Sequence, residues 1–84
     1  MDGFETGICE WFGSGGQSYG YLKKDSGGQI YVHFKHIKKV NLRDPKYAEI
    51  RPGDRVRFIV IEGHRNPGTQ AGEVEILEYG TDNG

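Results

Sequence analysis

The chain of 84 residues has room for one small domain and too few residues for a second hydrophobic core. The chain has eleven Lys and Arg and twelve Asp and Glu, so its net charge is −1. If it binds nucleic acid, interactions other than phosphate contacts must supply much of the affinity. A single cysteine (Cys9), no signal peptide and no segment with the ~20 apolar residues of a membrane helix favour a cytoplasmic protein without an intramolecular disulfide.

Short apolar runs separated by turn signals predict β-strands along most of the chain. The first three strands are expected over residues 7–12, 18–24 and 29–34. A glycine-rich stretch at 13–16 and a turn at 25–28 separate them. The apolar residues are spaced as in strands and form no long helical stripe.

The second half of the chain predicts two more strands after a long connection. Residues 35–39 are expected to form one helical turn, and 44–50 a second, with Asp44 as the N-cap and proline at the next position. Strands are then expected over 55–62 and 70–78. The order predicts an all-β fold, a small five-stranded antiparallel Greek-key β-barrel of the OB type. It would form one domain over 1–79, followed by a frayed C-terminal tail over 80–84.

Alternation along the strands separates a core face from an outer face. The core face is expected to carry Leu22, Ile30, Val32, Val56, Phe58, Val60, Gly72, Val74 and Ile76. The outer faces of the second and third strands then carry four rings, those of Tyr19, Tyr21, Tyr31 and His33.

A contiguous patch of exposed rings is typical of a binding surface. Rings bordered by lysines, as at Lys23, Lys35, Lys38 and Lys39, suit stacked bases, each of which contributes roughly 1–3 kcal/mol. The alternative is a structural role, with the rings packed under the loop over 38–52 or paired across strands.

Several linked segments resemble the cold-shock domain family. Residues 7–12, 18–22 and 30–34 are similar to its opening strand and its two RNP motifs, and residues 52–58 to its entry to the fourth strand. Residues 63–67, with Gln70 and Ala71, are similar to its last loop. The resemblance spans residues 7–77 and implies an OB-fold that binds single-stranded RNA or DNA in the manner of an RNA chaperone. It implies no enzymatic activity.

The resemblance also implies which side chains bind. A base-stacking platform would comprise Trp11, Tyr19, Tyr21, Tyr31, His33 and Phe34. Around it the expected contacts are Phe12 as a flanking ring, Tyr47 as the loop aromatic, Lys23 and Lys35 at the margin, and Arg65 and Gln70 on the opposite rim. Gly20 would keep the space between two tyrosine rings open.

Several positions depart from the family pattern, among them three in and just after the first strand. Glu10 stands where relatives usually carry Lys before the tryptophan, Gln17 replaces a second Lys, and Gly13 replaces an Asn. We therefore expect binding that depends more on stacking than on phosphates, and an affinity below that of basic relatives.

Two other functions remain open. The acidic substitutions favour a protein-interaction module on the same fold, and an aromatic platform also suits an oligosaccharide-binding barrel. No cofactor, metal, membrane or small-molecule partner is expected: His33 and His36 lack further ligands for zinc, and no phosphate-binding glycine loop is present. A monomer is expected.

Overall fold

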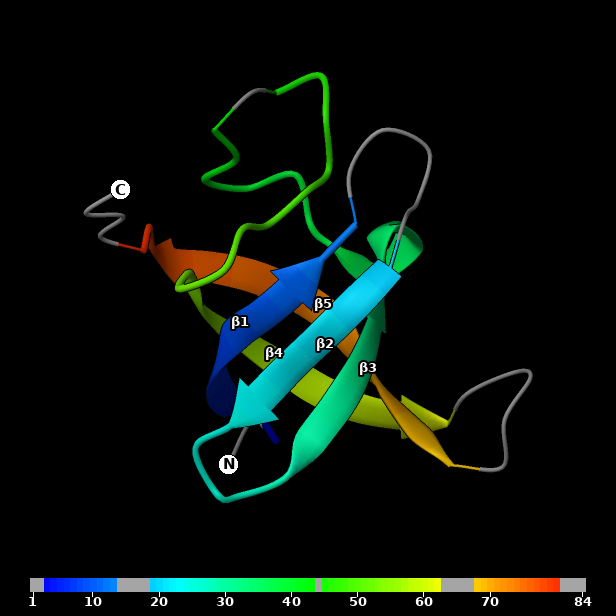
Figure 1. The fold of residues 1–84 in the computed structure, drawn as a ribbon. Helices are drawn as coiled ribbons and strands as arrows, with labels where there is room; N and C mark the ends of the chain where they lie inside the picture. Colours follow the sequence, from blue (N-terminus) through cyan, green and yellow to red (C-terminus); the bar gives the residue numbers. More distant parts are fainter. Residues whose placement is uncertain (1–2, 14–18, 44, 63–67, 81–84) are drawn as a thin grey trace.

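Five β-strands and one short 3-10 turn form the secondary structure of the computed structural model, which describes residues 3–13, 19–43, 45–62 and 68–80. They are β1 (Glu5–Phe12), β2 (Tyr19–Lys24), β3 (Gln29–His33), η1 (Phe34–His36), β4 (Arg55–Glu62) and β5 (Thr69–Glu78). In Figure 1, β1, β2 and β3 form one wall of the molecule, and β4 and β5 cross behind it.

The strands close into a barrel in the order β1-β2-β3-β5-β4, with β1 pairing to both β2 and β4. These pairs and the β4–β5 pair are antiparallel, as is β2–β3. The β3–β5 pair is parallel and short, joining Tyr31 to Gln70 and Val32 to Ala71. The predicted five-stranded barrel is confirmed.

The strand bounds follow the sequence expectations closely. β4 has the expected bounds, and the ends of the other strands differ by a residue or two. β1 already begins at Glu5, and β3 ends at His33 because Phe34 begins η1. Residue 18, expected to open the second strand, lies outside the described residues.

The connection between β3 and β4 differs from the two expected helical turns. The first, expected over 35–39, is the earlier and shorter η1, where the Lys35 amide donates to Nδ1 of His33 at 3.2 Å. The second, expected over 44–50, is wrong: 45–46 form a simple turn, 47–50 are not helical, and residue 44 is not among those described. Ile50, 2% exposed, packs into the core and fixes the end of this segment.

The barrel interior holds most of the predicted core. Buried hydrophobic side chains are Cys9, Leu22, Ile30, Val32, Ile37, Ile50, Val56, Phe58, Ala71, Val74 and Ile76. Val60 was predicted to join them but is 39% exposed. β1 pairs with β4 only as far as Phe58, so Val60 lies past the point where β1 closes the barrel.

The long β3–β4 connection is fastened to the end of β5 through Asp54, whose side chain is fully buried. Its carboxylate accepts hydrogen bonds from both terminal nitrogens of Arg43 (2.5 Å each) and from the amides of Arg51 and Gly80. The Arg43 guanidinium in turn lies 4.5 Å from the ring centre of Tyr79. Burial acts to raise the pKa of Asp54, but these hydrogen bonds outweigh it and hold the pKa below its ordinary value.

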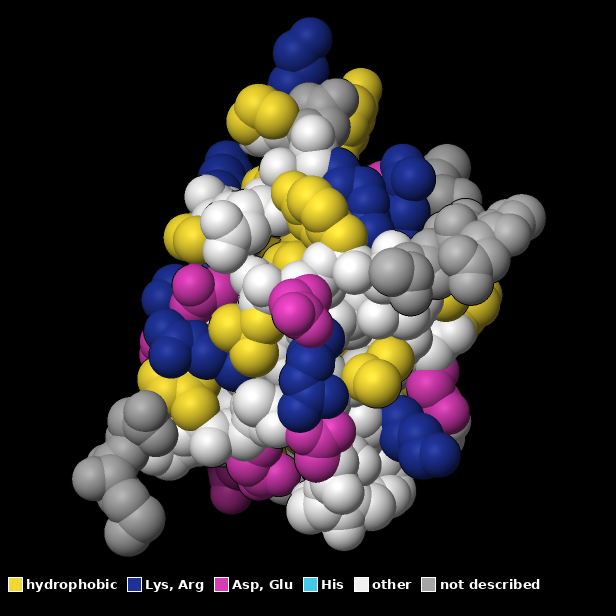
Figure 2. All heavy atoms as spheres, turned by 90° about the vertical axis from the view of Figure 1, so that its left-hand side faces the viewer, with side chains coloured by type: hydrophobic (Ala, Val, Ile, Leu, Met, Phe, Trp, Pro, Cys, Tyr) yellow, Lys and Arg dark blue, Asp and Glu magenta, His cyan; other side chains and the backbone are white. Residues whose placement is uncertain are grey.

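Charges of both signs are interleaved on the surface. Arg55 pairs with Asp25 and Arg57 with Glu75, and Figure 2 shows one such mixed face with separate hydrophobic side chains between the charges. Across the described ranges, no helix is long and apolar enough to span a membrane.

Candidate nucleic-acid interface

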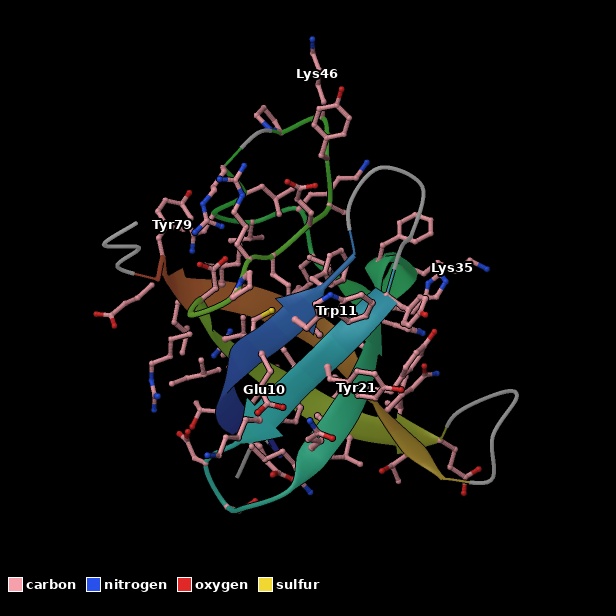
Figure 3. All side chains as sticks on the ribbon, in the orientation of Figure 1. Glu10, Trp11, Tyr21, Lys35, Lys46 and Tyr79 are labelled. Carbon is pink, nitrogen blue, oxygen red and sulfur yellow. The ribbon has the colours of Figure 1, made fainter. Side chains whose placement is uncertain are left out.

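Six aromatic side chains gather on the outer side of β1, β2, β3 and η1, and we call this group the aromatic platform. Its members are Trp11, Tyr19, Tyr21, Tyr31, His33 and Phe34. Figure 3 shows Trp11 and Tyr21 on the side of the sheet that faces the viewer. The structure thus brings together all six rings that the sequence placed in one group.

The rings form a continuous series of contacts. Tyr19 lies edge-on to Trp11 (5.4 Å between centroids) and stacks on Tyr31 (5.7 Å). Tyr31 also meets Tyr21 edge-on at 5.9 Å and His33 at 6.5 Å. His33 then contacts Phe34 at 4.9 Å. These spacings are typical of aromatic pairs that orient one another.

Three of the rings remain open to solvent despite these contacts. Trp11 is 42% exposed, Phe34 40% and Tyr21 39%. Tyr19, Tyr31 and His33 are half-buried between them. Since exposed apolar surface is unfavourable in water, a contiguous group of open rings is typical of a surface that meets a partner.

A β-bulge in β1 turns Trp11 outward. Cys9 pairs with Leu22 and Trp11 with Tyr21, so Glu10 is an extra residue in β1. Strict alternation would place Trp11 on the same inner face as Cys9. The extra residue reverses the phase, as bulges do, and adds the indole to the outer rings.

Gly20 has a role other than the predicted one. A Cβ at this position would lie 2.0 Å from the carbonyl oxygen of Trp11 and 2.7 Å from the Cα of Phe12. The missing side chain therefore allows β1 to approach β2 at the bulge, on the inner side of the sheet. It does not separate the tyrosine rings.

The margin of the platform carries charged and polar groups. Lys23 follows Tyr21 on the outer face of β2, and Lys35 projects from η1 at one end (Figure 3). Both are exposed. On the same outer face, Nε2 of Gln29 donates to Oε1 of Glu10 at 2.5 Å.

Four other predicted site residues are not members of the aromatic platform or lie outside the described residues. Phe12 is half-buried and packs against the core. Tyr47 is 59% exposed in the long connection, next to Lys46 at its outer tip (Figure 3). Gln70 lies beside Tyr31 but is only 6% exposed, and its Nε2 donates to the Glu62 carbonyl. Arg65 is not among the described residues, and binding by all four stays a prediction.

The sequence reasoning missed the bridge between Glu10 and Gln29. Its signal was available: a four-residue turn after Lys24 sets Gln29 opposite Lys23, and alternation then places Gln29 on the outer face with Tyr31. Alternation from the inward-facing Cys9 likewise places Glu10 on the outer face, so both partners of the bridge could have been assigned to this face from the sequence.

The described residues offer little for bond-making chemistry. Burial, and after it the charge of Asp54, raises the pKa of Cys9 to about 12, so its thiol stays protonated at neutral pH. No group of three or more His, Cys, Asp or Glu suited to a metal occurs in the parts of the chain that the structure describes. What the surface presents instead is a set of open rings with a polar margin.

Comparison with known proteins agrees with this geometry. The family model described as "'Cold-shock' DNA-binding domain" matches residues 5–77. "Cold shock protein CapB" of Pseudomonas syringae pv. tomato is 30% identical over 77 residues, which cover 92% of this chain and 100% of that protein. "Cold shock-like protein" of Thermotoga maritima is 32% identical over 72 residues, covering 86% and 97%. "Cold shock protein CspA" of Staphylococcus epidermidis is 27% identical over 63 residues, covering 75% and 86%.

Proposed function

The chain belongs to the cold-shock DNA-binding domain family, and we propose that it binds single-stranded RNA or DNA by stacking bases on the aromatic platform. The observation that carries this proposal is the continuous series of ring contacts from Trp11 to Phe34, with three rings open to solvent. Each base stacked on such a ring contributes about 1–3 kcal/mol, and every base has a face to stack. A duplex keeps its bases stacked on one another and offers no such face.

The distribution of charge supports binding despite the net charge of −1. The four arginines that the structure describes all pair with acids: Arg43 with Asp54, Arg51 with Glu49, Arg55 with Asp25 and Arg57 with Glu75. Lys23 and Lys35 have no such ion pair within the described residues, and they border the platform. The few cations at the site predict a shallow salt dependence, since log K falls with log salt by about 0.7 per phosphate neutralised on a single strand.

A protein that binds unpaired strands and not paired ones shifts pairing equilibria by mass action. The proposed activity is therefore that of an RNA chaperone: the bound strand stays open, and no covalent bond is made or broken. A monomer suffices, because the platform is built within a single chain.

The test uses Trp11, the only tryptophan of the chain, as its reporter. A single-stranded pyrimidine oligonucleotide should quench its fluorescence saturably, because a base would cover the 42% exposed indole. A duplex of equal length should leave the signal unchanged. Equal quenching by duplex, or no quenching by the single strand, would contradict the proposal.

A second candidate function is a protein-interaction module on the same fold. The observation that favours it is the Glu10 carboxylate beside the platform, where it would repel a phosphate backbone. Under this hypothesis neither the single strand nor the duplex changes Trp11 fluorescence in a folded protein. The titration therefore separates the two functions.

A further inference from the structure

The bridge between Glu10 and Gln29 lies across the binding face. Glu10 belongs to β1 and Gln29 to β3, with β2 between them (Figure 1). Outer strands of such a trio are roughly 10 Å apart, so the two side chains must meet above β2. The pairings of Trp11 with Tyr21 and of Lys23 with Gln29 set the crossing point above β2 between the positions of Tyr21 and Lys23.

The bridge has a defined hydrogen-bonding polarity. A carboxylate only accepts, so the Gln29 group that faces Glu10 must be its NH₂, at 2.5 Å. One proton of this NH₂ is used, and the second makes no hydrogen bond to any part of the chain that the structure describes. Within the described residues the other oxygen of Glu10, Oε2, accepts no hydrogen bond. One bridge thus carries both an unused acceptor and an unused donor, next to the position of Tyr21 on β2.

From this arrangement we propose that Glu10 and Gln29 read the Watson–Crick edge of a base stacked on Tyr21 and select cytosine or adenine over uracil or thymine. This inference rests on the proposed function. Cytosine presents an amino donor at N4 beside an acceptor at N3, and adenine presents the same pair at N6 and N1. The amino group donates to Glu10 Oε2, and the ring nitrogen accepts from Gln29. Carboxylate-to-amino contacts of this kind are an established way of recognising cytosine.

Uracil and thymine present the opposite pattern. Their O4 would face the carboxylate, acceptor against acceptor, and their N3–H would face the NH₂ of Gln29, donor against donor. Polar groups left unpaired on binding lose the hydrogen bonds that they had to water. Glu10 therefore weakens the binding of uracil and thymine more than it weakens the binding of a strand of other bases.

The competing explanation is that Glu10 affects binding by repelling phosphates. This explanation differs from edge recognition in one measurable respect. Repulsion of the backbone weakens binding of every sequence by the same factor. Edge recognition changes the ratio of affinities between two sequences. The ratio cancels the contribution of the common backbone.

The experiment compares single strands of about eight deoxycytidines or eight deoxyuridines, a length within the usual site size of an OB-fold. The two strands differ only at C4 and N3 of the base. The wild-type protein should bind deoxycytidine more tightly by about fivefold or more, the discrimination of a good contact to a base edge. Substituting N4,N4-dimethyldeoxycytidine, which lacks the amino protons, should abolish the preference without any change to the protein.

Variants then assign the preference to residues. Glu10→Gln should bring the ratio close to one, since an amide offers either polarity, and Gln29→Leu should reduce it by removing the donor. Glu78→Gln makes the same charge change at the end of β5, away from the platform strands, and should keep the wild-type ratio. A ratio that Glu10→Gln leaves unchanged would overturn the inference, even if all affinities rise.

The outcomes separate this inference from the proposed function. Equal binding of the two strands by the wild-type protein would overturn edge recognition and leave stacking on the platform intact. Binding of neither strand by a folded protein would overturn both.

Discussion

Tyr21 is the platform position at which a truncation tests stacking with least disturbance to the fold. It is 39% exposed and, among the described residues, has one ring partner, Tyr31, at 5.9 Å. Tyr31 has three ring partners, so removing it would loosen the platform as well as a binding contact. We therefore expect Tyr21→Ala to weaken binding far more than it weakens folding.

The magnitudes follow from these contacts. Loss of one stacked base costs about 1–3 kcal/mol, which corresponds to a roughly 5- to 150-fold rise in Kd. Loss of one edge-on ring contact costs about 0.5–1.5 kcal/mol of folding free energy. For a domain of this size, that lowers Tm by about 4–8 °C per kcal/mol.

Titrating Trp11 fluorescence with a single-stranded oligonucleotide, together with a thermal melt, measures both effects. Leu77→Ala is the matched control, because Leu77 is 43% exposed but lies on β5, away from the platform. The control should retain wild-type affinity. Wild-type affinity in a folded Tyr21→Ala protein would refute stacking on this ring.

Three further predictions concern the loop anchor, the bulge and the charge beside the platform. Asp54→Asn should lower the urea-unfolding free energy by about 2–4 kcal/mol, because an amide can accept from only half of the donors around Asp54 and leaves Arg43 uncompensated. Since the pKa of Asp54 is lowered on folding, its stabilisation is complete above about pH 4 and is lost as the pH falls through the lowered value; unfolding curves at decreasing pH should therefore bring wild type and variant together. Gly20→Ala should destabilise the fold by at least about 1–3 kcal/mol and shift the Trp11 emission, since its Cβ would collide with the backbone of β1; an unchanged melt would show that the bulge can adjust. Glu10→Lys should tighten binding of an oligothymidylate and steepen its log–log salt slope by about 0.7, whereas an unchanged slope would place β1 away from the phosphates.

Hydrophobic alternation predicted most of the barrel because nearly every strand has one buried face. Leu22, Ile30 and Val32 are buried where the pattern placed them, and the turn signals set strand ends within a residue or two. The pattern failed at Val60 because burial also depends on which strand covers a residue. β1 stops pairing at Phe58, and nothing local in the sequence around Val60 indicates this.

The candidate site depends on a feature that periodicity does not carry. Counting alternate residues from Cys9 places Trp11 in the core, and only the resemblance to a family placed it among the outer rings. The structure supplies the physical reason, since the bulge at Glu10 reverses the alternation and Gly20 leaves room for it. The network of Arg43, Asp54 and Tyr79 could not be predicted from the sequence either, because its members meet only when the long β3–β4 connection packs against the end of β5.

The separation between that network and the platform explains how an acidic chain can keep a nucleic-acid surface. The described arginines are held in ion pairs with acids, and the buried pair of Arg43 with Asp54 fixes the long connection. Lysines border the rings instead, as compact, strongly hydrated charges, and Lys23 and Lys35 have no acid partner among the residues that the structure describes. The net charge adds the ion-paired arginines and their acids to the lysines at the platform, so it does not show the local positive charge beside the rings. It also follows that a change such as Glu10→Gln, outside the stabilising network, can alter what is bound while leaving the barrel intact.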